Sequence, residues 1–207
     1  MQSESSPGGR RRSFIEGARR AQIVAAAAHT VAAVGYAGAS LSRIATQAGI
    51  SKSVISYHFA GKEDLLAQVV NDFFTATDEY MSGRLARAET AAGAIRTWVG
   101  AQIDYFAEHR TTFLAVSDIA MNYRSTDGAR PFLDSAATEE AENVGQILRR
   151  GQEAGEFRDF DSTDVAVIIS RSTEGVLGAW MSDERIDLMA QKQTLLDFID
   201  HAIRKDQ

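Results

Sequence analysis

The chain has 207 residues, a formal net charge of −6 and no cysteine. This length allows one domain of ordinary size and a smaller one, and a hydrophobic content of 44% supports a buried core. The lack of cysteine excludes a disulfide framework and a thiolate metal site, and no stretch holds the ~18 consecutive apolar residues of a membrane span. With only two prolines and abundant Ala, Leu, Glu, Gln and Arg, the composition predicts an all-α chain.

Charge is divided unevenly along the sequence. Residues 1–64 hold eight Lys or Arg and four Asp or Glu, a balance of +4, whereas residues 65–207 hold the remaining 14 and 24, a balance of −10. A basic head on an acidic body directs one end of the molecule at a polyanion. The alternative is a chance asymmetry without functional meaning.

The first segment, residues 1–13, is rich in Ser, Gly and Pro and contains Arg10, Arg11 and Arg12. Such a composition predicts a disordered basic arm. Its arginines are suited to follow phosphates or to enter a minor groove, and a merely solvated tail is the alternative.

The run from Arg11 to Ile15 is also similar to a twin-arginine export signal, with a small-residue cleavage site at 37–39. The residues between these points disfavour this interpretation, because they include Glu, Arg, Gln and His side chains. Their apolar members follow a helical stripe, which consists of Ile23, Ala27, Val31 and Val34. We therefore predict a helix that braces the element after it.

Two short helices joined by a tight turn are predicted next. Ser40 is a good N-cap for the first of them. Gly49 stands where this helix must stop in a left-handed conformation, which glycine adopts at little cost. Ser51 then caps the second helix, and Ile50 and Ile55 can form a hydrophobic staple across that cap.

The second helix keeps a polar outer face, because Ile55 and Phe59 lie four residues apart and point inward. The side chains left outside are Lys52, Ser53, Ser56 and Tyr57. Hydroxyls, an amine and a phenol on one helix can hydrogen-bond phosphates and base edges in a major groove. The pattern predicts a DNA-binding helix-turn-helix.

Beyond this motif the chain stays helical. Lys62 opens a long amphipathic helix and is placed to reach a phosphate, the alternative being a solvated lysine. Further helix breaks are expected at Gly83, Gly93, His109-Arg110 and the ranges 125–131, 155–164 and 181–187.

The middle helices are rich in aromatic residues, which can line an apolar cavity for a small molecule. The candidate ligand residues are Trp98, Tyr105, Phe113, Met121 and Tyr123, with Asp118, Asn122 and Arg171 as polar groups. For any single aromatic residue among them, plain core filling is the alternative.

Two apolar stripes lie on the last predicted helices, 164–181 and 188–203. Apolar faces on adjacent helices suit a four-helix bundle formed with a second copy of the chain. The candidate interface residues are Val165, Ile169, Val176, Trp180, Leu195 and Ile199. The alternative is that both stripes are buried inside one chain.

Residues 20–66 resemble the N-terminal signature of the TetR-type regulators. The matching positions are Ile23, Val24, Ala27, Gly35-Tyr36, Ser40, Ile44-Ala45, Ala48-Gly49-Ile50-Ser51, Tyr57-His58-Phe59 and Lys62-Glu63-Asp64-Leu65. A weaker similarity to the ligand domain of that family runs through Ile147-Leu148, Gly151 and Gly155-Glu156-Phe157-Arg158. Val54 and Ser56 depart from the family pattern where DNA contact is expected, so the operator sequence cannot be carried over.

The resemblance implies an all-α fold with an N-terminal three-helix helix-turn-helix domain at 14–61. A larger helical ligand-binding and dimerisation domain follows at 62–207. It implies a cytoplasmic repressor, nucleoid-associated when bound, that holds a palindromic double-stranded DNA operator as a homodimer and is released by a small apolar or aromatic effector. The expected DNA-contacting residues are Ser40, Ser51, Lys52, Ser53, Ser56, Tyr57, His58 and Lys62.

Catalysis finds little support in the sequence. The four histidines, His29, His58, His109 and His201, show no paired metal-ligand spacing. No Gly-rich phosphate loop, Gly-x-Ser-x-Gly elbow or cysteine nucleophile is present. The acidic pairs Glu139-Glu140 and Asp183-Glu184 are interpreted as solvated faces. We expect no enzyme, cofactor or metal, and the alternative function is a small-molecule binding or sequestering protein without DNA function.

Overall fold

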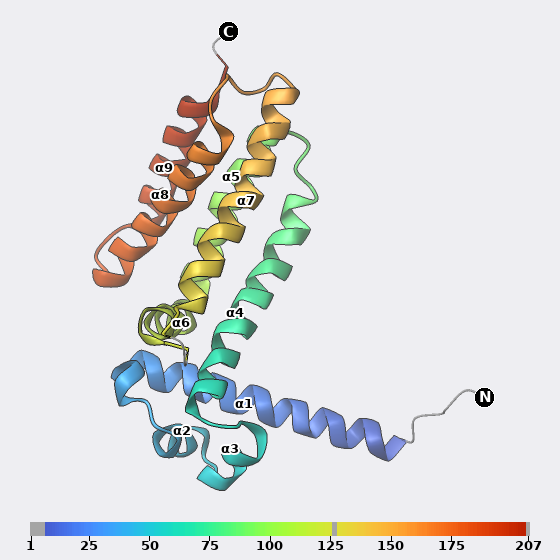
Figure 1. Ribbon diagram of the computed structural model, residues 1–207, viewed down its shortest axis with the longest axis vertical. Coiled ribbons are helices and arrows are strands. Elements are labelled where there is room, and N and C mark those ends of the chain that lie inside the picture. Colours follow the sequence, from blue (N-terminus) through green and yellow to red (C-terminus); the bar gives the residue numbers. More distant parts are fainter. Residues whose placement is uncertain (1–6, 126–127, 206–207) are drawn as a thin grey trace, which may run out of the picture. The chain divides into compact units, whose positions relative to one another are not determined.

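The computed structural model describes residues 7–125 and 128–205, with side chains from Phe14 onward except at 133–139. Within this part the chain is helical throughout (Figure 1), which confirms the predicted all-α class. The helices are α1 (Pro7–Gly38), α2 (Leu41–Ala48), α3 (Lys52–His58), α4 (Lys62–Leu85), α5 (Ala91–Glu108), α6 (Arg110–Asn122), α7 (Pro131–Glu153), α8 (Ser162–Ser182) and α9 (Leu188–Ile203).

The chain forms two compact units whose boundary crosses α4. The first unit holds α1, α2, α3, the part of α4 up to Phe73, and α6. The second unit holds the rest of α4 with α5, α7, α8 and α9. Helix α6 therefore belongs with the helix-turn-helix, although the sequence assigned it to the 62–207 domain.

Helix α1 begins at Pro7, inside the segment that the sequence analysis takes as a disordered arm. Its residues Ile23, Ala27 and Val31 are buried, as the predicted stripe requires, whereas Val34 is 45% exposed. The stretch Phe14–Gly38 is long and apolar enough to cross a membrane by composition alone. The buried stripe and the packing of α1 against α2 explain this apolar character as a helix-turn-helix core.

A kink at Gly35 interrupts α1 near its end. The φ and ψ angles there are 74° and 165°, a combination that essentially only glycine adopts. The chain recovers a helical turn at once, because the Ala39 N–H donates to the Gly35 carbonyl at 3.0 Å. Gly35 thus sets the direction in which the chain enters α2.

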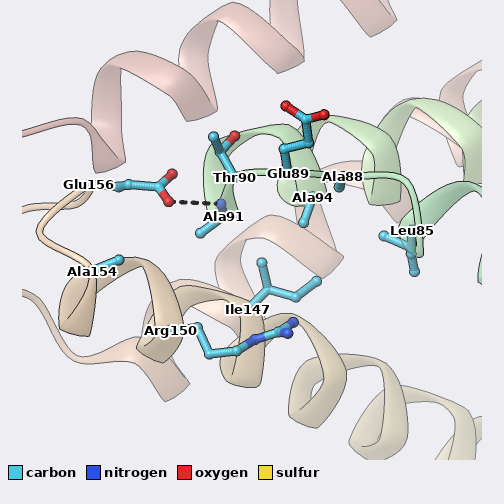
Figure 2. A pocket seen from close by; sticks show the side chains of 10 residues that line it. All are labelled: Leu85, Ala88, Glu89, Thr90, Ala91, Ala94, Ile147, Arg150, Ala154 and Glu156. Carbon is cyan, nitrogen blue, oxygen red and sulfur yellow. Dashed lines mark hydrogen bonds between the residues drawn. The ribbon is translucent and has the colours of Figure 1, made fainter.

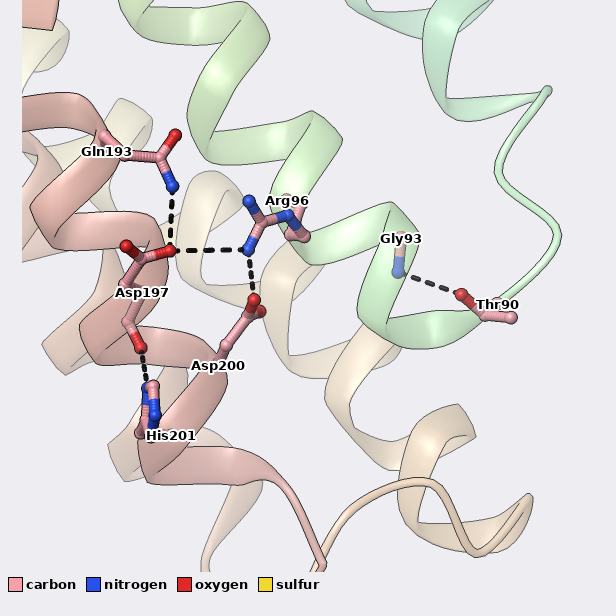
Figure 3. Close-up of polar contacts among 7 residues, drawn as sticks. All are labelled: Thr90, Gly93, Arg96, Gln193, Asp197, Asp200 and His201. Atoms are coloured by element: carbon pink, nitrogen blue, oxygen red, sulfur yellow. Dashed lines mark hydrogen bonds and ion pairs between the residues drawn. The ribbon is translucent and has the colours of Figure 1, made fainter.

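In the second unit, α7 packs on α5 and α8, and α9 packs on α5 and α8. The fully buried side chains that fill this bundle include Ile95, Ile103, Leu148 and Ile203. Polar pairs tie α9 to α5 at its surface, where Arg96 forms an ion pair with Asp200 (Figure 3) and Lys192 lies 2.6 Å from Asp104.

The turn between α7 and α8 depends on a close approach at Gly151. A Cβ at this position would lie 2.2 Å from the Phe157 ring, so a larger residue would displace the ring. Glu156 follows in the same turn, and its two carboxylate oxygens accept the N–H groups of Ala91 and Ala92 at 3.0 Å each. The turn therefore caps the start of α5 (Figure 2).

A hollow of about 270 Å³ opens beside this cap. Figure 2 shows its lining, which comes from the start of α5, the end of α7 and the segment before α5: Leu85, Ala88, Glu89, Thr90, Ala91, Ala94, Ile147, Arg150, Ala154 and Glu156. The last residues of the chain hold the other side of the turn, since Arg158 donates from its backbone N to Ile203 O and from Nε to Ala202 O.

The helix breaks agree with the sequence except near two glycines. Gly83 lies inside α4 and Gly93 inside α5, so the predicted breaks there are wrong and the actual gap falls between Leu85 and Ala91. Gly93 is in the first turn, where its N–H donates to the N-cap hydroxyl of Thr90 at 3.0 Å. Gly83 meets no atom within 4 Å on the outside of α4, where a glycine costs only about 1 kcal/mol.

Candidate nucleic-acid interface

Helix α2 is capped at both ends as its sequence predicts. The Ser40 hydroxyl accepts the Arg43 N–H at 3.3 Å. Gly49 has φ 66° and ψ 32°, the left-handed conformation that ends the helix. Ile44 and Ala45 are buried, which fixes α2 on the core of the first unit.

Helix α3 is anchored by its inner face. Ile55 and Phe59 are 0% and 3% exposed, which confirms their predicted orientation. Ser51 holds the N-cap position, but its hydroxyl shares a 2.8 Å hydrogen bond with the Ser53 hydroxyl instead of accepting a helix N–H. The predicted side-chain cap at Ser51 is therefore wrong, because the neighbouring hydroxyl competes for it.

The outer face of α3 is polar and open. Lys52, Ser53 and Ser56 are exposed, and Tyr57 is 73% exposed. The Tyr57 and His58 rings meet edge to face with 5.0 Å between centroids, which orients the phenol. A helix that keeps an exposed phenol, ammonium and hydroxyls over a buried anchor offers its donors to an external partner.

A shallow hollow of about 240 Å³ adjoins this face, lined by Ile15, Glu16, Arg19, Val54, Tyr57 and His58. The α1 residues of this surface could not be predicted, since nothing in their spacing indicates that they lie beside α3. Phe14 and Ile15 beside it are 77% and 59% exposed. The start of α1 thus extends the surface that α3 presents.

Arg20 braces the end of α3, a role that the sequence did not reveal. Its guanidinium donates to the His58 carbonyl at 2.6 Å and to Gln68 Oε1 at 3.1 Å, and it lies 4.3 Å from the Phe59 ring centroid. A single arginine on a helix gives no sequence signal for such a contact, because its partners lie 38 and 48 residues away.

Lys62 has an internal partner instead of pointing freely outward. Its ammonium donates to the Tyr36 carbonyl at 2.6 Å and lies 4.4 Å from the Tyr36 ring centroid. The predicted phosphate contact is thus disfavoured, since the side chain is already committed to the kink of α1.

Asp118 of α6 binds the backbone N–H of the same residue, Tyr36, on the other side of its Cα. Its Oδ2 accepts the Tyr36 N–H at 2.5 Å, and Asn122 Nδ2 donates to Oδ1 at 2.8 Å. Burial raises the pKa of the Tyr36 phenol, with the charge of Glu63 adding to the effect. We call Gly35, Tyr36, Lys62, Asp118 and Asn122 the Tyr36 cluster.

The family model described as "Bacterial regulatory proteins, tetR family" matches residues 23–69, which span the buried stripe of α1, the two motif helices and the first part of α4. Residues 23–69 therefore form a DNA-binding helix-turn-helix of the TetR type. The chain as a whole is similar to TetR-family transcriptional regulators.

Full-length relatives agree with this assignment. The chain is 26% identical over 196 residues to the HTH-type transcriptional repressor AcnR of Corynebacterium jeikeium, covering 90% of this chain and 92% of that protein. The fold matches FadR of Bacillus subtilis in complex with stearoyl-CoA at 22% identity and TM-score 0.75, over 88% of this chain and 98% of that one. A regulator of Saccharomonospora viridis in complex with choline matches at 23% identity and TM-score 0.75, over 92% and 100%.

The ligand residues predicted from the sequence are divided between the two units. Asp118 and Asn122 belong to the Tyr36 cluster, and Phe113 is buried against Phe73 in the same unit, with 6.2 Å between ring centroids. Met121 is 56% exposed, and Tyr123 lies close enough to Tyr36 to affect its pKa. All five candidates therefore lie in the first unit, and their contact with a ligand stays a prediction.

Tyr105, Trp98 and Arg171 lie in the second unit. Tyr105 is buried and stacks on His109 with 4.1 Å between centroids. Trp98 and Arg171 both lie near Glu140, a residue that the sequence analysis interpreted as solvated. Glu140 is half-buried, and burial raises its pKa, so the interpretation as a fully solvated side chain does not describe it.

The surroundings of Glu140 combine hydrogen-bond donors with acceptors that lack a partner. Its Oε1 accepts Gln102 Nε2 at 2.8 Å, and the Trp98 side chain also hydrogen-bonds to the carboxylate. Among the described residues, Gln102 Oε1 and Ser170 Oγ are buried without a hydrogen-bond partner. We call Trp98, Gln102, Glu140 and Arg171, together with Ser170, which precedes Arg171 in the sequence, the Glu140 cluster.

Half of the predicted interface residues lie in the core of their own chain. Ile169, Leu195 and Ile199 are 3%, 8% and 3% exposed, because α8 and α9 turn these positions toward the bundle. Val165, Val176 and Trp180 are half-buried, and the Trp180 ring lies under the Arg110 guanidinium. The large apolar side chains left exposed on these helices are Val167, Ile168, Met189 and Phe198.

Proposed function

We propose that this protein is a ligand-responsive repressor of the TetR type that binds a palindromic operator as a homodimer in the cytoplasm. The observation that carries the proposal is the outer face of α3. Its ammonium, hydroxyls and phenol are exposed, whereas Ile55 and Phe59 hold the helix from behind. AcnR, a full-length relative, is named a transcriptional repressor.

We assign the exposed side chains of α3 to different parts of the DNA. Lys52 and Ser53 stand in the first turn, and Ser56 lies one turn further along the same face, so we assign these three to base edges. Tyr57 is assigned to a phosphate, which its phenol can reach as a donor. Arg10, Arg11 and Arg12 lie near the beginning of α1 and are assigned to phosphates or the minor groove.

Dimerisation is assigned to the exposed stripe of α8 and α9 instead of the buried one. Ile168 and Phe198 are 56% and 62% exposed, and clustered apolar side chains on a surface mark an interaction site. Gly175, at the same outer side of α8, meets no atom within 4 Å and leaves room for a second helix. A dimer bound to a palindromic operator must present its two recognition helices to major grooves about 34–36 Å apart, or a multiple of that distance.

Release by an effector is assigned to α6. This helix belongs to the DNA-binding unit, yet only His109 separates it in sequence from α5 of the second unit. A shift of α5 is therefore transmitted along the chain to α6, and Asp118 passes it to the peptide of Tyr36. An effector that favours the displaced arrangement by about 1–3 kcal/mol lowers operator affinity about 5- to 150-fold.

A footprint on the DNA beside the coding sequence tests operator binding. We expect protection of an inverted repeat, and protection of a site without internal symmetry would contradict the dimer. Ser56→Ala should change the preferred base at one or two positions of the repeat, whereas Lys52→Ala should also lower the salt slope by about one unit. Failure to shift any genomic fragment would favour the alternative, a small-molecule binding protein without DNA function.

Sedimentation equilibrium tests the dimer face. Phe198→Glu should convert the dimer to monomer, since a charge on each subunit would be buried at the twofold. Phe14→Glu is the matched control, because Phe14 is also exposed but lies on α1. If Phe198→Glu remains a dimer, the proposed face is wrong.

A further inference from the structure

The buried acceptors of the Glu140 cluster indicate what kind of ligand the second unit takes. Gln102 donates its amide N–H to Glu140, which leaves its carbonyl oxygen Oε1 buried and unpartnered among the described residues. The same holds for the Ser170 hydroxyl, whose residue is only 4% exposed. Buried polar atoms are normally hydrogen-bonded, so two such acceptors beside a carboxylate require a reason.

From helical geometry we infer that these acceptors lie at the same level of the bundle. Glu140 and Gln102 are in direct contact across α7 and α5. Helices α7 and α8 follow each other through a short turn and run antiparallel, and a Cβ on Gly145 would lie 3.8 Å from that of Ala166. One helical turn is about four residues. A step of one turn from Gly145 back to Ala141 on α7 corresponds to a step from Ala166 forward to Ser170 on the antiparallel α8. Ser170 is therefore level with Ala141, which follows Glu140 in the sequence.

The local charge is negative. Arg171 is a cation whose charge acts on Glu140, but it is already paired with Glu174 at 2.6 Å. Glu140 therefore keeps an unbalanced carboxylate, which accepts from Gln102 and Trp98 and has acceptor positions left. A carboxylate, an amide oxygen and a hydroxyl together match a group that carries several N–H donors and a positive charge.

We propose that the Glu140 cluster binds the protonated amine of an organic effector, with Glu140 as the counter-ion and Gln102 Oε1 and Ser170 Oγ as the further acceptors. This deepens the ligand response of the proposed function and rests on it. The Trp98 ring supplies an aromatic face beside the ammonium. The remainder of the effector is apolar, in keeping with the buried apolar side chains of α5, α7 and α8.

Isothermal titration of the full-length protein with n-octylammonium at neutral pH tests the proposal. Octanol and octanoate carry the same chain with a neutral and a negative head, and octyltrimethylammonium keeps the charge without N–H donors. We expect n-octylammonium to bind most tightly. Glu140→Gln should weaken it about 10- to 100-fold, the value of a hydrogen bond to a charged group.

Glu142→Gln is the matched control, because Glu142 is exposed on the same helix, and it should leave the affinity unchanged. Glu140→Asp keeps the charge and should retain more affinity than Glu140→Gln, which separates loss of charge from misfolding. Equal binding of octanol, or equal affinity of Glu140→Gln and wild type, would overturn the proposal. So would a crystal structure in which a water bridges Gln102 and Ser170 while n-octylammonium does not bind.

Operator titrations with n-octylammonium separate this inference from the proposed function. Release of DNA by n-octylammonium in the wild type, and not in Glu140→Gln, supports both. Release by another compound, with no binding of n-octylammonium, overturns the amine assignment and leaves the ligand-responsive regulator standing. If the protein binds no operator, the proposed function is wrong. Glu140-dependent binding of the amine would still support the assignment of the cluster.

Discussion

The Tyr36 cluster and the Glu140 cluster are both polar groups set among packed helices, but they differ in how completely they are satisfied. In the first, the Tyr36 N–H and carbonyl are bound by Asp118 and Lys62, and Asn122 occupies the second Asp118 oxygen. In the second, Gln102 Oε1 and Ser170 Oγ have no partner among the described residues. A satisfied network stabilises one arrangement, whereas an unsatisfied one costs free energy that a ligand can recover.

The difference assigns separate tasks to the two units. The direction of the chain matters where α1 leads into the helix-turn-helix. Asp118 and Lys62 therefore fix the two peptide groups on either side of the Tyr36 Cα, directly after Gly35. A ligand site must leave donors or acceptors open, and this lowers the stability of the free protein. The following predictions test the contrast, from the largest expected effect to the smallest.

Gly35→Ala should destabilise the protein by about 2–3 kcal/mol, because a residue with a Cβ is strained at φ 74° and ψ 165°. Space is not the reason, since the nearest atom to an added Cβ, Asp118 Oδ2, would lie 3.5 Å away. Gly17→Ala is the control and should be neutral or stabilising, because Gly17 has open space within α1. Urea denaturation measures both, and equal stability of the two variants would mean that the kink is not required.

Asp118→Ala should cost about 2 kcal/mol of stability, the value of a hydrogen bond to a charged group, and should also reduce operator affinity. Asn122→Ala removes the exposed neighbour and is expected to change stability by no more than about 0.5 kcal/mol. Denaturation and operator titration of both variants check this. An Asp118→Ala protein as stable as Asn122→Ala would show that the Tyr36 cluster is not rigidly held.

Ser170→Ala should raise the stability of the ligand-free protein by about 1 kcal/mol, because it removes a buried hydroxyl that has no partner. Thr173→Val is the matched comparison on the same helix face, since the Thr173 hydroxyl is buried but donates to Ile169 O at 3.0 Å. It should lower stability or leave it unchanged. A rise in melting temperature confined to Ser170→Ala is expected, and a loss there would contradict the unsatisfied state of the Glu140 cluster.

The smallest effect is the dependence of stability on pH. Burial raises the pKa of Glu140 above its ordinary value of 4.5. Between 4.5 and the raised value the folded chain holds a proton that the unfolded chain has lost, so the free energy of unfolding falls as pH rises through this window. The difference in unfolding free energy between wild type and Glu140→Gln, measured from about pH 4 to 8, should show this fall. A flat difference would contradict a buried, unbalanced carboxylate.

The helix-turn-helix could be predicted from the sequence because its signals are local. Gly49, Ser40 and the pair Ile55 and Phe59 act within one or two helical turns, so their spacing is sufficient. The internal partner of Lys62 lies 26 residues away, and Asp118 meets Tyr36 across 82 residues. No local pattern encodes such contacts, and for this reason Lys62 was assigned to a phosphate and Asp118 to a ligand.

The lack of a local sequence signal also explains which features of the second unit could not be predicted. Helical periodicity marks the apolar stripes of α8 and α9 but does not say whether Ile169 and Leu195 face their own bundle or a partner. Glu140, next to Glu139, has the local appearance of a solvated acidic pair. Its burial follows from the packing of α7 on α5 and α8, which the composition of one helix does not reveal.

The turn between α7 and α8 joins three distant parts of the chain. Glu156 holds the first N–H groups of α5, and the neighbouring Arg158 is bound to carbonyls at the end of α9. The beginning of α5 and the end of α9 thus share one support, so they should open together in a single subglobal unfolding event. In native-state hydrogen exchange, the amides of Ala91 and Arg158 would then report the same opening free energy despite their distance in sequence.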